Sequence, residues 1–509
     1  MKNTLMRLQL PTRHLTNVVA FLFFIACADV AVAESVTKPC RVSGIPRDVQ
    51  CGFVTRPLNP AAPDGVKIRV HYVVIPAEAR NKNADPVFFF AGGPGQSAIK
   101  IAPKLAPAFA RFSNRRDLVF VDQRGTGKSA ALTCDRQPTT SLTSMLNQES
   151  IVAQIIQCKE ALQKLPHGDL RFYTTPIAMQ DFDAIRLALG YSKINAIGGS
   201  YGTRAILDFM RQYPLSIRRA VIDGVAPPDM VLPISPSLDA QAALDAIFTD
   251  CAADALCGKT YPSLKEKWQQ LLASLPRNVR VTHPVTGRSE AITITRDVLV
   301  GLLRSPLYFP TYTALLPSAI NAATNGVFEP LFGAAAAMGS STDGMSMGMH
   351  FSVVCAEDYP LMQRTAAPTA VQEMGRDFGD QFAQMYRQVC SQWPRGSVPD
   401  AFYKVGPALS PVLVLSGGID PVTPPRHGAA VAQALGSNAR HIVVPKAGHG
   451  VMTIGCMRDV LFKFIDFKGD MTSANDPRLL AETKTQCVES IPRPSVFVPL
   501  ADRLSKVLP

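Results

Sequence analysis

The sequence lacks several features that would assign it to a common functional class. Beyond residues 1–33, no segment is long and apolar enough to resemble a membrane-spanning helix. No C-x-x-C pair and no cluster of cysteine with histidine indicates a zinc site. The chain has no internal repeats, no long block of lysine and arginine and no nucleic-acid-binding motif. These absences argue against membrane-embedded, zinc-dependent, repeat and nucleic-acid-binding proteins.

The composition describes an ordinary globular protein with a large hydrophobic core. Of its 509 residues, 47% are hydrophobic and 18% are charged, and this length suggests two or three domains. The formal net charge is +12, but the basic residues are scattered along the chain. We therefore expect weak attraction to anionic surfaces and no nucleic-acid partner.

Residues 1–33 have the organisation of a secretory signal peptide. The basic residues that open this segment are Lys2, Arg7 and Arg13. Residues 18–28 form an apolar stretch too short to span a bilayer, and the A-V-A at residues 31–33 matches a small-residue cleavage site. We predict export to the periplasm or the extracellular space, with no stable membrane insertion after cleavage. The alternative is a lipid anchor on Cys27, for which Phe24 is a poor match.

The cysteines support export. Without Cys27 the chain has 11 − 1 = 10 cysteines, and an even set in an exported protein favours disulfides. They fall as close neighbours, namely Cys40 and Cys51, Cys134 and Cys158, Cys251 and Cys257, Cys355 and Cys390, and Cys456 and Cys487. We predict five disulfides between these neighbours, although spacing does not determine connectivity.

The most informative motif is G-G-S-Y-G at residues 198–202. It lies between a strand-like run at 193–197 and a helix-like run at 203–213 with its apolar residues on one face. A G-x-S-x-G in this position is typical of a nucleophile elbow, a turn so sharp that glycine is needed on either side of the serine. We therefore predict that Ser200 is a nucleophile.

Two later loops carry the partners that a nucleophilic serine needs. The strand-like run 411–415 leads into a loop with Asp420, and the run 441–445 leads into a loop with His449. The order serine, aspartate, histidine is that of α/β-hydrolases. In such a triad the histidine takes the proton of the serine, and the acid fixes the histidine tautomer.

Each partner also has a simpler explanation. Asp420 could be only a turn former before Pro421, and His449 an ordinary loop histidine between two glycines. Among the eight histidines, His427 is the nearest competitor. We prefer His449 because it alone follows a strand on a glycine-flanked loop.

An oxyanion hole is predicted from a glycine-rich loop. The apolar run 86–90 leads into A-G-G-P-G-Q-S at residues 91–97, which lets a backbone N–H face a reacting carbonyl oxygen. We predict that the N–H groups of Gly93 and Tyr201 are the two donors. The alternative for the loop is a plain Gly-Pro turn.

A second glycine-rich stretch, D-Q-R-G-T-G-K-S at residues 122–129, ends like a phosphate loop. That motif needs a glycine five positions before Gly127, where the chain has Asp122. Nucleotide binding is therefore rejected, and we expect a polar turn that braces the active-site face.

Four motifs together resemble one family. G-G-P-G-Q-S, D-Q-R-G-T-G-K-S, G-G-S-Y-G and A-G-H-G are similar to those of the prolyl iminopeptidase and tripeptidyl aminopeptidase group of α/β-hydrolases, over about residues 50–225 and 405–470. The group often has histidine before Gly-Gly-Pro-Gly, where this chain has Ala91, as is commoner in the secreted, tripeptidyl-like branch. The resemblance implies peptide substrates with a free N-terminus and acidic recognition of the amine from a cap.

The alternation of expected strands and helices predicts a largely parallel sheet. Expected strands lie at 67–75, 87–90, 118–121, 194–197 and 220–222. Residues 228–405 are instead mostly helical in pattern. We predict a signal peptide at 1–33, an α/β-hydrolase core at 34–227 and 406–509, and an inserted, mainly helical cap domain at 228–405.

Two features of the predicted cap suggest binding. Glu357 and Asp358 follow an apolar run at 351–354, and we predict that they bind the substrate amine; the alternative is a solvated turn. Residues 338–350 are rich in methionine and end in His350, a composition that suits cuprous ions. We prefer a flexible cap loop for this stretch and predict no metal site.

The sequence therefore predicts an exported serine peptidase with the triad Ser200, Asp420 and His449 and no cofactor. It would remove one or a few residues from the free N-terminus of short peptides. An esterase or lactonase would use the same residues, and a non-catalytic binding protein on a hydrolase scaffold is the alternative from another class.

Overall fold

The structure is a computed structural model that describes residues 35–134, 141–339, 344–365, 376–469 and 473–500. The chain divides into two units, residues 1–32 and 33–509. The predicted signal peptide and Cys27 lie outside the described residues, so all elements below belong to the second unit.

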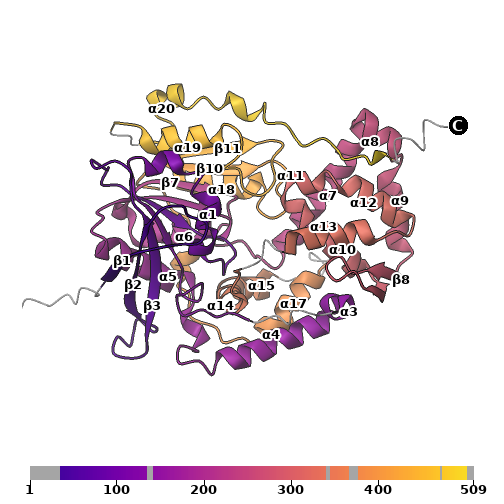
Figure 1. Ribbon diagram of the computed structural model, residues 1–509, viewed down its shortest axis with the longest axis horizontal. Helices are drawn as coiled ribbons and strands as arrows, with labels where there is room; N and C mark the ends of the chain where they lie inside the picture. The colour runs from indigo at the N-terminus through magenta and orange to yellow at the C-terminus, as the bar shows by residue number, and fades with distance from the viewer. Residues whose placement is uncertain (1–34, 135–140, 340–343, 366–375, 470–472, 501–509) are drawn as a thin grey trace, which may run out of the picture. The chain divides into compact units, whose positions relative to one another are not determined.

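A nine-stranded sheet forms the core of the fold, in the order β1-β2-β3-β5-β4-β6-β7-β10-β11 (Figure 1). The strands are β1 Ser35–Cys40, β2 Val49–Pro57, β3 Lys67–Ile75, β4 Val87–Phe90, β5 Leu118–Val121, β6 Ile194–Gly199, β7 Ile217–Asp223, β10 Val412–Gly417 and β11 Ala439–Val444. From β5 to β11 all neighbours run parallel, whereas β1, β2 and β3 form antiparallel pairs at one edge. The predicted α/β-hydrolase sheet is confirmed.

The two parts of the core meet between β7 and β10. Val412 lies opposite Ala220, and Leu415 lies opposite Asp223. The chain therefore leaves the sheet after β7 and returns to the neighbouring position, so the residues between these strands form an insertion. Asp420 follows the strand beside the one that ends in Asp223, which brings distant parts of the sequence to one edge of the sheet.

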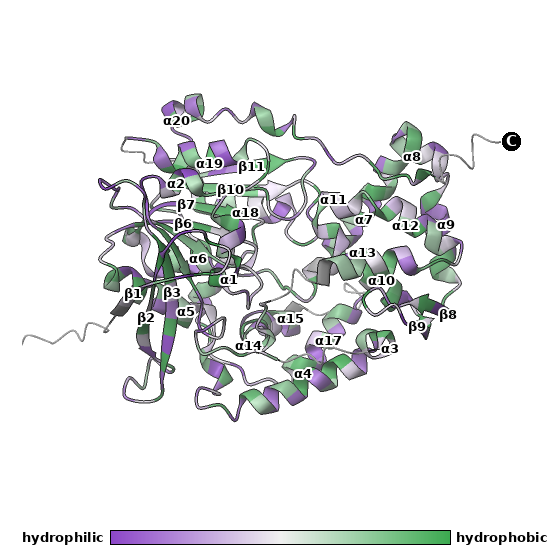
Figure 2. Cartoon of the chain, in the orientation of Figure 1, coloured by the Kyte–Doolittle hydropathy of each residue, from purple (hydrophilic) through white to green (hydrophobic). Residues whose placement is uncertain are grey.

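Strand β4 shows why the central strands are apolar throughout. Phe88 and Phe90 pack into the hydrophobic cluster on one face of the sheet, and Val87 and Phe89 into the cluster on the other. Because side chains alternate between faces, a strand covered on both sides has no position for an exposed polar residue. Many of the surrounding helices have one hydrophobic and one hydrophilic side (Figure 2).

The helices outside the insertion cover the sheet or extend from it. They are α1 Ala98–Leu105, α2 Ala110–Ser113, α3 Leu142–Leu146, α4 Gln148–Leu162, α5 Thr175–Ala188, α6 Tyr201–Gln212, α18 Pro425–Leu435, α19 Met457–Asp466 and α20 Pro477–Glu482. Helix α4 packs against helices of the insertion rather than against a strand.

The insertion is mostly helical and also contains a β-hairpin. Its elements are α7 Ser235–Ala253, α8 Ala255–Thr260, α9 Leu264–Ala273, β8 Arg277–Thr282, β9 Ser289–Ile294, α10 Arg296–Arg304, α11 Pro310–Thr313, α12 Leu316–Thr324, α13 Glu329–Gly339, α14 Met347–Glu357, α15 Tyr359–Thr365 and α17 Gln381–Cys390. Helices α7, α9, α10, α12 and α13 form a hydrophobic cluster of their own, around the buried Trp268.

The later helices of the insertion join the core. Phe351, Val354 and Tyr386 of α14 and α17 belong to the same hydrophobic cluster as β4 and β6. The last described residues follow the core in sequence but pack against the insertion. Val498 lies in the hydrophobic cluster of the insertion, and the Phe497 N–H donates to the Ala314 carbonyl at 2.9 Å. The domain boundaries at 227/228 and 405/406 stay a prediction.

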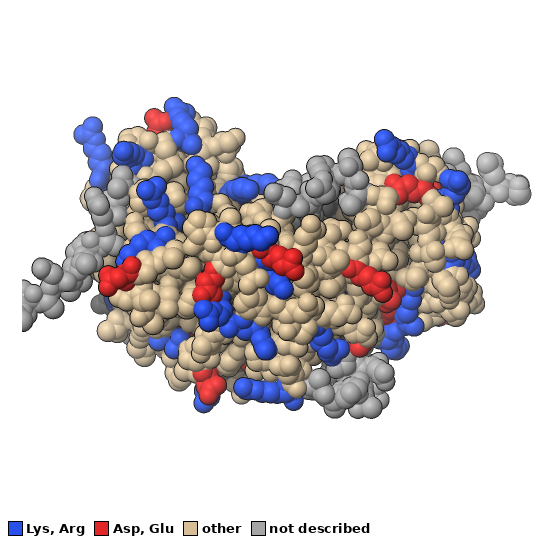
Figure 3. Space-filling view, turned by 90° about the horizontal axis from the view of Figure 1, so that it is seen from below, with Lys and Arg blue, Asp and Glu red and all other residues tan. Residues whose placement is uncertain are grey.

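None of the described helices combines the length and apolarity needed to cross a bilayer. Lysine and arginine side chains are spread over the face in Figure 3, with acidic side chains between them and no continuous basic patch on that face.

The five predicted disulfides are confirmed. The bonded pairs are Cys40–Cys51, Cys134–Cys158, Cys251–Cys257, Cys355–Cys390 and Cys456–Cys487. Each closes a short loop, and Cys355–Cys390 joins helices α14 and α17.

We expect reduction to destabilise the protein strongly. A bridge of this loop size contributes about 2–4 kcal/mol by restricting the unfolded chain. Thermal denaturation with and without a reductant should show a marked fall in melting temperature, and mass spectrometry of the unreduced protein should find no free thiol among the ten cysteines. Several free thiols in the folded protein would contradict the pairing.

Candidate active site

Ser200 stands on a sharp turn between β6 and α6. Its backbone has φ 56° and ψ −129°, a conformation that a residue with a side chain rarely adopts. Its N–H donates to the Asp223 carbonyl at 2.9 Å, and its carbonyl accepts from the Thr203 N–H at 2.9 Å. The next strand and the first turn of α6 therefore hold the strained residue in place.

The glycines on either side of Ser200 are closely packed, and at position 202 the packing requires glycine. A Cβ on Gly198 would lie 2.8 Å from Ile206 Cδ1, and a Cβ on Gly202 would lie 2.1 Å from the Phe90 carbonyl oxygen. The second contact is with backbone of β4, which has no side-chain freedom to move away. A larger residue at position 202 would therefore push α6 off the sheet and displace the serine.

Asp420 uses its two carboxylate oxygens differently. Oδ1 accepts hydrogen bonds from the backbone N–H groups of Val422 and Thr423, both at 2.8 Å. Oδ2 contacts His449 Nδ1 at 2.8 Å and accepts from Thr423 Oγ1 at 2.8 Å. The explanation as a turn former and the explanation as a triad acid therefore apply to different oxygens of one residue. The turn fixes the direction of the oxygen that faces His449.

His449 is held by its backbone and by its ring. Its N–H donates to the Tyr308 carbonyl at 2.9 Å, and the Tyr308 ring meets the imidazole edge-on, with ring centroids 5.2 Å apart. Thr423 Oγ1 lies 3.1 Å from Nδ1. Because Nδ1 is engaged by Asp420, Nε2 is the nitrogen left to exchange a proton with a nucleophile. Tyr308 ends the short helix η3 (Pro306–Tyr308), so the insertion helps to position this loop.

For both His449 and Asp420, burial and charge shift the pKa in opposite directions. Burial lowers the pKa of His449, but the charge of Asp420 and the hydrogen bond to it outweigh burial, so the pKa lies above the ordinary histidine value. Burial raises the pKa of Asp420, but the charge of His449 and the donated hydrogen bonds bring it below the usual value. Asp420 is therefore ionised at neutral pH and can stabilise an imidazolium.

Asp223 connects the turn of Ser200 with the loop of His449. Its carbonyl accepts from Ser200, and its Oδ2 accepts from the N–H groups of Val451 and Met452, both at 2.7 Å. Burial raises the pKa of this carboxyl to about 6, and the two N–H donors limit the rise. One buried residue thus joins the serine turn, through its carbonyl, to the loop that carries the histidine, through its side chain.

The glycine-rich loop after β4 lies beside Ser200. A Cβ on Gly92 would be 3.3 Å from Ser200 Cβ. Gly93 has φ 110°, and a Cβ there would be 2.7 Å from the Gly95 nitrogen, so glycine is required. Tyr201 is the first residue of α6, where an N–H has no partner within the helix. The two backbone segments therefore flank the serine, and the oxyanion role of Gly93 and Tyr201 stays a prediction.

The insertion holds this loop directly. Ser346 N–H donates to the Gly95 carbonyl at 2.8 Å, and Gln96 pairs with Met345 in an antiparallel bridge. A rearrangement of the insertion at this point would therefore move the loop that carries Gly93.

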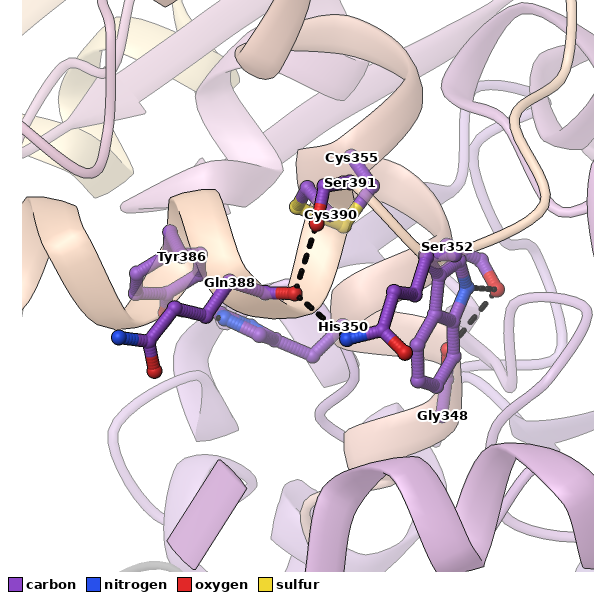
Figure 4. The surroundings of a disulfide bond; sticks show 10 residues. Gly348, His350, Ser352, Cys355, Tyr386, Gln388, Cys390 and Ser391 are labelled. Carbon is purple, nitrogen blue, oxygen red and sulfur yellow. Dashed lines mark hydrogen bonds between the residues drawn. A yellow bond between two sulfur atoms is a disulfide. The ribbon is translucent and has the colours of Figure 1, made fainter. Parts of the chain in front are cut away.

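A buried histidine adds a second contact from the insertion to the loop. His350 Nδ1 lies 3.1 Å from the Pro94 carbonyl, and Nε2 lies 2.7 Å from the Tyr386 hydroxyl. Burial lowers the pKa of His350, which favours a neutral ring that donates to Pro94 and accepts from Tyr386. The Cys355–Cys390 disulfide joins the helices of His350 and Tyr386 close to both residues (Figure 4).

The methionine-rich stretch 338–350 has structural contacts where it is described. Met349 is fully buried in the core cluster, and both ring nitrogens of His350 are engaged. Residues 340–343 lie outside the described residues. In the part of the chain that the structure describes, no group of three or more His, Cys, Asp or Glu residues could hold a metal ion.

Glu357 and Asp358 are fully buried and lie next to Arg204 of α6. Arg204 binds Asp358 through both terminal nitrogens, at 2.9 and 3.0 Å, and reaches Glu357 at 3.5 Å. Asp358 also accepts from the Leu232 N–H at 3.0 Å. Asp358 therefore has a full countercharge inside the protein, whereas Glu357 shares the same cation. The amine-binding role of the two carboxylates stays a prediction.

Glu357 is linked to the residue that follows the serine. It accepts from the Thr175 N–H at 2.7 Å and from Thr175 Oγ1 at 3.0 Å, and Thr175 Oγ1 lies 2.6 Å from the Tyr201 hydroxyl. Gln123 donates to the Tyr201 hydroxyl at 2.9 Å. Burial raises the pKa of Glu357 to about 7, and the charge of Arg204 limits the rise. This carboxyl can therefore change its charge near neutral pH.

The turn at residues 122–129 braces the glycine-rich loop, as the sequence led us to expect. Asp122 Oδ1 accepts from Ser97 Oγ at 2.6 Å and from the Ile99 N–H at 3.1 Å, where the loop enters α1. Arg124 forms a fully buried bidentate pair with Asp181, at 2.6 and 2.8 Å. These contacts occupy the polar groups of the turn with structural partners.

Sequence reasoning missed three residues that contact the predicted triad. Thr423 lies three residues after Asp420, a spacing at which an aspartate can hold a turn, so a local signal existed. Asp223 was visible only as the end of a strand. Tyr308 comes from the insertion and has no sequence signal, because its contact with His449 exists only in the folded chain.

Family models match the chain in two places. The model described as alpha/beta hydrolase fold matches residues 85–254, and the model described as TAP-like protein matches residues 374–470. The first range contains Ser200, and the second contains Asp420 and His449.

Three curated relatives cover most of the chain. A tripeptidyl aminopeptidase of Streptomyces coelicolor is 27% identical over 462 residues, which are 84% of this chain and 82% of the relative. The serine protease Hip1 of Mycobacterium tuberculosis is 26% identical over 431 residues, 78% of this chain and 82% of the relative. Carboxylesterase B of the same species is 26% identical over 424 residues, 77% and 79% of the two chains.

Sequence similarity to these hydrolases extends through both parts of the core and the insertion, and the fold agrees with it. The protein is therefore a serine hydrolase of the α/β-hydrolase fold, and it is similar to TAP-like proteins.

Proposed function

We propose that the protein is an exported serine peptidase that releases one or a few residues from the free N-terminus of short peptides. The observation that supports the chemistry is the Asp420–His449 pair, at 2.8 Å, on loops anchored through Asp223 to the turn of Ser200. The tripeptidyl aminopeptidase relative supports the substrate class. The predicted signal peptide and the five disulfides support export.

The proposed reaction passes through an acyl-enzyme. Ser200 Oγ attacks the carbonyl carbon of the scissile bond while His449 Nε2 takes its proton. The N–H groups of Gly93 and Tyr201 donate to the oxyanion that forms. His449 then gives the proton to the leaving amine as the carbon–nitrogen bond breaks. Water, deprotonated by His449, releases the N-terminal fragment, and Asp420 stays ionised throughout.

An esterase is the second candidate, because the carboxylesterase B relative covers a similar share of the chain. The two functions use the same nucleophile and differ in whether the site recognises a free amine. Aminoacyl-, dipeptidyl- and tripeptidyl-coumarin substrates, each free and N-acetylated, separate them. We expect release of coumarin from free peptides and little from acetylated ones. Equal cleavage of both forms, or activity on simple esters alone, would favour the esterase.

Amine recognition by Glu357 has one electrostatic argument in its favour. Arg204 already neutralises Asp358, so Glu357 is the carboxylate of the cluster that lacks a countercharge of its own. An aminopeptidase needs such a group to disfavour blocked substrates. Since Glu357 is fully buried, an ammonium would reach it only if α14 moves away from α5. The same residue could instead position Tyr201 through Thr175.

We expect Ser200→Ala to abolish hydrolysis and to leave the fold intact, because loss of a triad member costs several orders of magnitude in turnover. Asp420→Asn should be severely impaired, since the amide no longer fixes the histidine tautomer. Steady-state kinetics and circular dichroism measure both effects. Wild-type turnover in folded Asp420→Asn would assign the acid role to another residue.

We expect kcat/KM to rise with pH along a limb whose midpoint lies above the ordinary histidine pKa of 6.5. The base must be neutral to accept the serine proton, and the charge of Asp420 raises the pKa at which His449 loses its own proton. Residual activity of Asp420→Asn should therefore titrate at lower pH. A wild-type midpoint below 6.5 would contradict the pairing.

We expect Glu357→Gln to raise KM for peptides with a free amine and to leave hydrolysis of a simple acetate ester almost unchanged. The neutral amide keeps the shape of the side chain and removes its charge. Matched kinetics on both substrates separate the two roles. Equal losses on peptide and ester would contradict amine binding and favour positioning of Tyr201.

A further inference from the structure

The insertion contains a partly buried arginine, Arg304, that meets no carboxylate among the described residues. Arg304 is the last residue of α10, and its Nη1 is buried with no hydrogen-bond partner among the described residues. No ion pair to Arg304 is found there either, whereas the fully buried Arg204 and Arg124 each have a bidentate carboxylate. A buried charge normally requires such a partner.

Aromatic rings contact the face of the Arg304 guanidinium but accept no hydrogen bond in its plane. The Arg304 guanidinium lies over the Phe382 ring at 4.0 Å from its centroid and near Phe378 at 5.8 Å. Stacking of this kind covers the face of the guanidinium. The N–H groups lie in the plane of the guanidinium, and the buried Nη1 has no acceptor among the described residues. Burial lowers the pKa of Arg304, which is the direction expected for a cation that has lost water without gaining an anion.

The neighbours of Arg304 place it close to the candidate active site. Its charge acts on the hydroxyl of Tyr308, which ends the next short helix in the chain, and on that of Tyr386, whose ring contacts Phe382 on α17. Tyr308 contacts His449 through its carbonyl and its ring. Tyr386 contacts His350, which contacts the Pro94 carbonyl of the glycine-rich loop. Arg304 therefore lies between the part of the insertion that touches the histidine and the part that touches the oxyanion loop.

Ring contacts and a disulfide restrain the surroundings of Arg304. Phe382 and Tyr386 are in ring contact at 5.0 Å on α17, and the Cys355–Cys390 disulfide ties α17 to α14 beside His350 (Figure 4). A cation held this way loses little side-chain freedom when it binds a ligand, so its discrimination between charged and neutral groups should be large.

We propose that Arg304 binds a carboxylate of the substrate, so that the enzyme prefers substrates with a negative charge near the bond that is cut. This proposal rests on the proposed hydrolysis at Ser200 but not on peptide cleavage. The carboxylate can come from the side chain of an acidic residue next to the scissile bond or from the C-terminus of a short peptide. In both cases the planar guanidinium offers two parallel N–H donors to two oxygens.

The first test uses esters that differ only in charge. Kinetics are measured on mono-p-nitrophenyl adipate and on its neutral methyl ester, with wild type, Arg304→Met, Arg304→Lys and the control Arg288→Gln, an exposed arginine of the β8–β9 turn. We expect wild type and Arg288→Gln to prefer the anionic ester by about 10-fold or more in kcat/KM. Arg304→Lys should keep part of this preference, and Arg304→Met should lose it while it still hydrolyses the neutral ester.

Peptides identify the source of the carboxylate. Coumarin substrates with Glu or Gln before the cut test an acidic side chain, and tetrapeptides with a free or amidated C-terminus test the terminal carboxylate. If wild type prefers the charged substrate in one of these two comparisons and Arg304→Met does not, that comparison identifies the source of the carboxylate. If no peptide is cleaved but the ester preference is present, the peptidase proposal fails and the role of Arg304 stands.

The proposal is overturned if wild type shows no preference for the anionic ester, or if folded Arg304→Met keeps that preference. If Arg304→Met does not fold, inhibition of the wild-type enzyme provides the test. Adipate should then inhibit hydrolysis of the neutral ester, whereas its neutral diamide should not. Equal inhibition by the acid and the diamide would contradict a site for carboxylates.

Discussion

The structure depends on one tight turn, in which Ser200 adopts φ 56° between β6 and α6. A serine in this conformation is unfavourable by itself, so the surroundings must hold it. They do so by close contact: α6 begins against the Phe90 carbonyl, where only glycine fits at position 202, and the Asp223 carbonyl binds the serine N–H. The position of the serine, the N-terminus of α6 and the glycine-rich loop are therefore set together.

The rest of the candidate site is built from parts of the chain that meet only in the folded state. Asp223 links the serine turn to the loop of His449, and Asp420 holds its own turn with one oxygen and the histidine with the other. The insertion does not merely cover the site. Through Tyr308 it contacts His449, and through Ser346 and His350 it holds the glycine-rich loop. Changes in the insertion should therefore affect the chemistry as well as the choice of substrate.

Much of this was predictable where the signal is local. A strand such as Lys67–Ile75 has a clear alternation, and the glycine-flanked Ser200 and His449 follow strands in the expected order. The disulfides could be predicted because each pair closes a short loop. The role of Thr423 was accessible in principle, because its backbone is bound by Asp420 three residues earlier.

Other features could not be inferred from the sequence because they depend on tertiary contacts. The weak signals of β1 and β2 are completed only by pairing, of β1 with β2 and of β2 with β3, and α4 finds its partners in a distant helix, α17. As two adjacent acids, Glu357 and Asp358 suggest a solvent-facing cluster in the sequence. In the structure they are fully buried and pair with Arg204 of α6. Arg304 is an ordinary helical arginine in the sequence, and only the folded chain shows that its buried Nη1 has no partner among the described residues.

The most direct test of the account is to find which side chain reacts as a nucleophile. The purified protein is treated with a fluorophosphonate, and the modified peptide is identified by mass spectrometry. The account predicts a single phosphonylated residue, Ser200, with loss of hydrolysis in proportion to labelling, because Asp223 ties the turn of this serine to the loop of the Asp420–His449 pair. Labelling at a different residue, or full activity after complete labelling of Ser200, would contradict it.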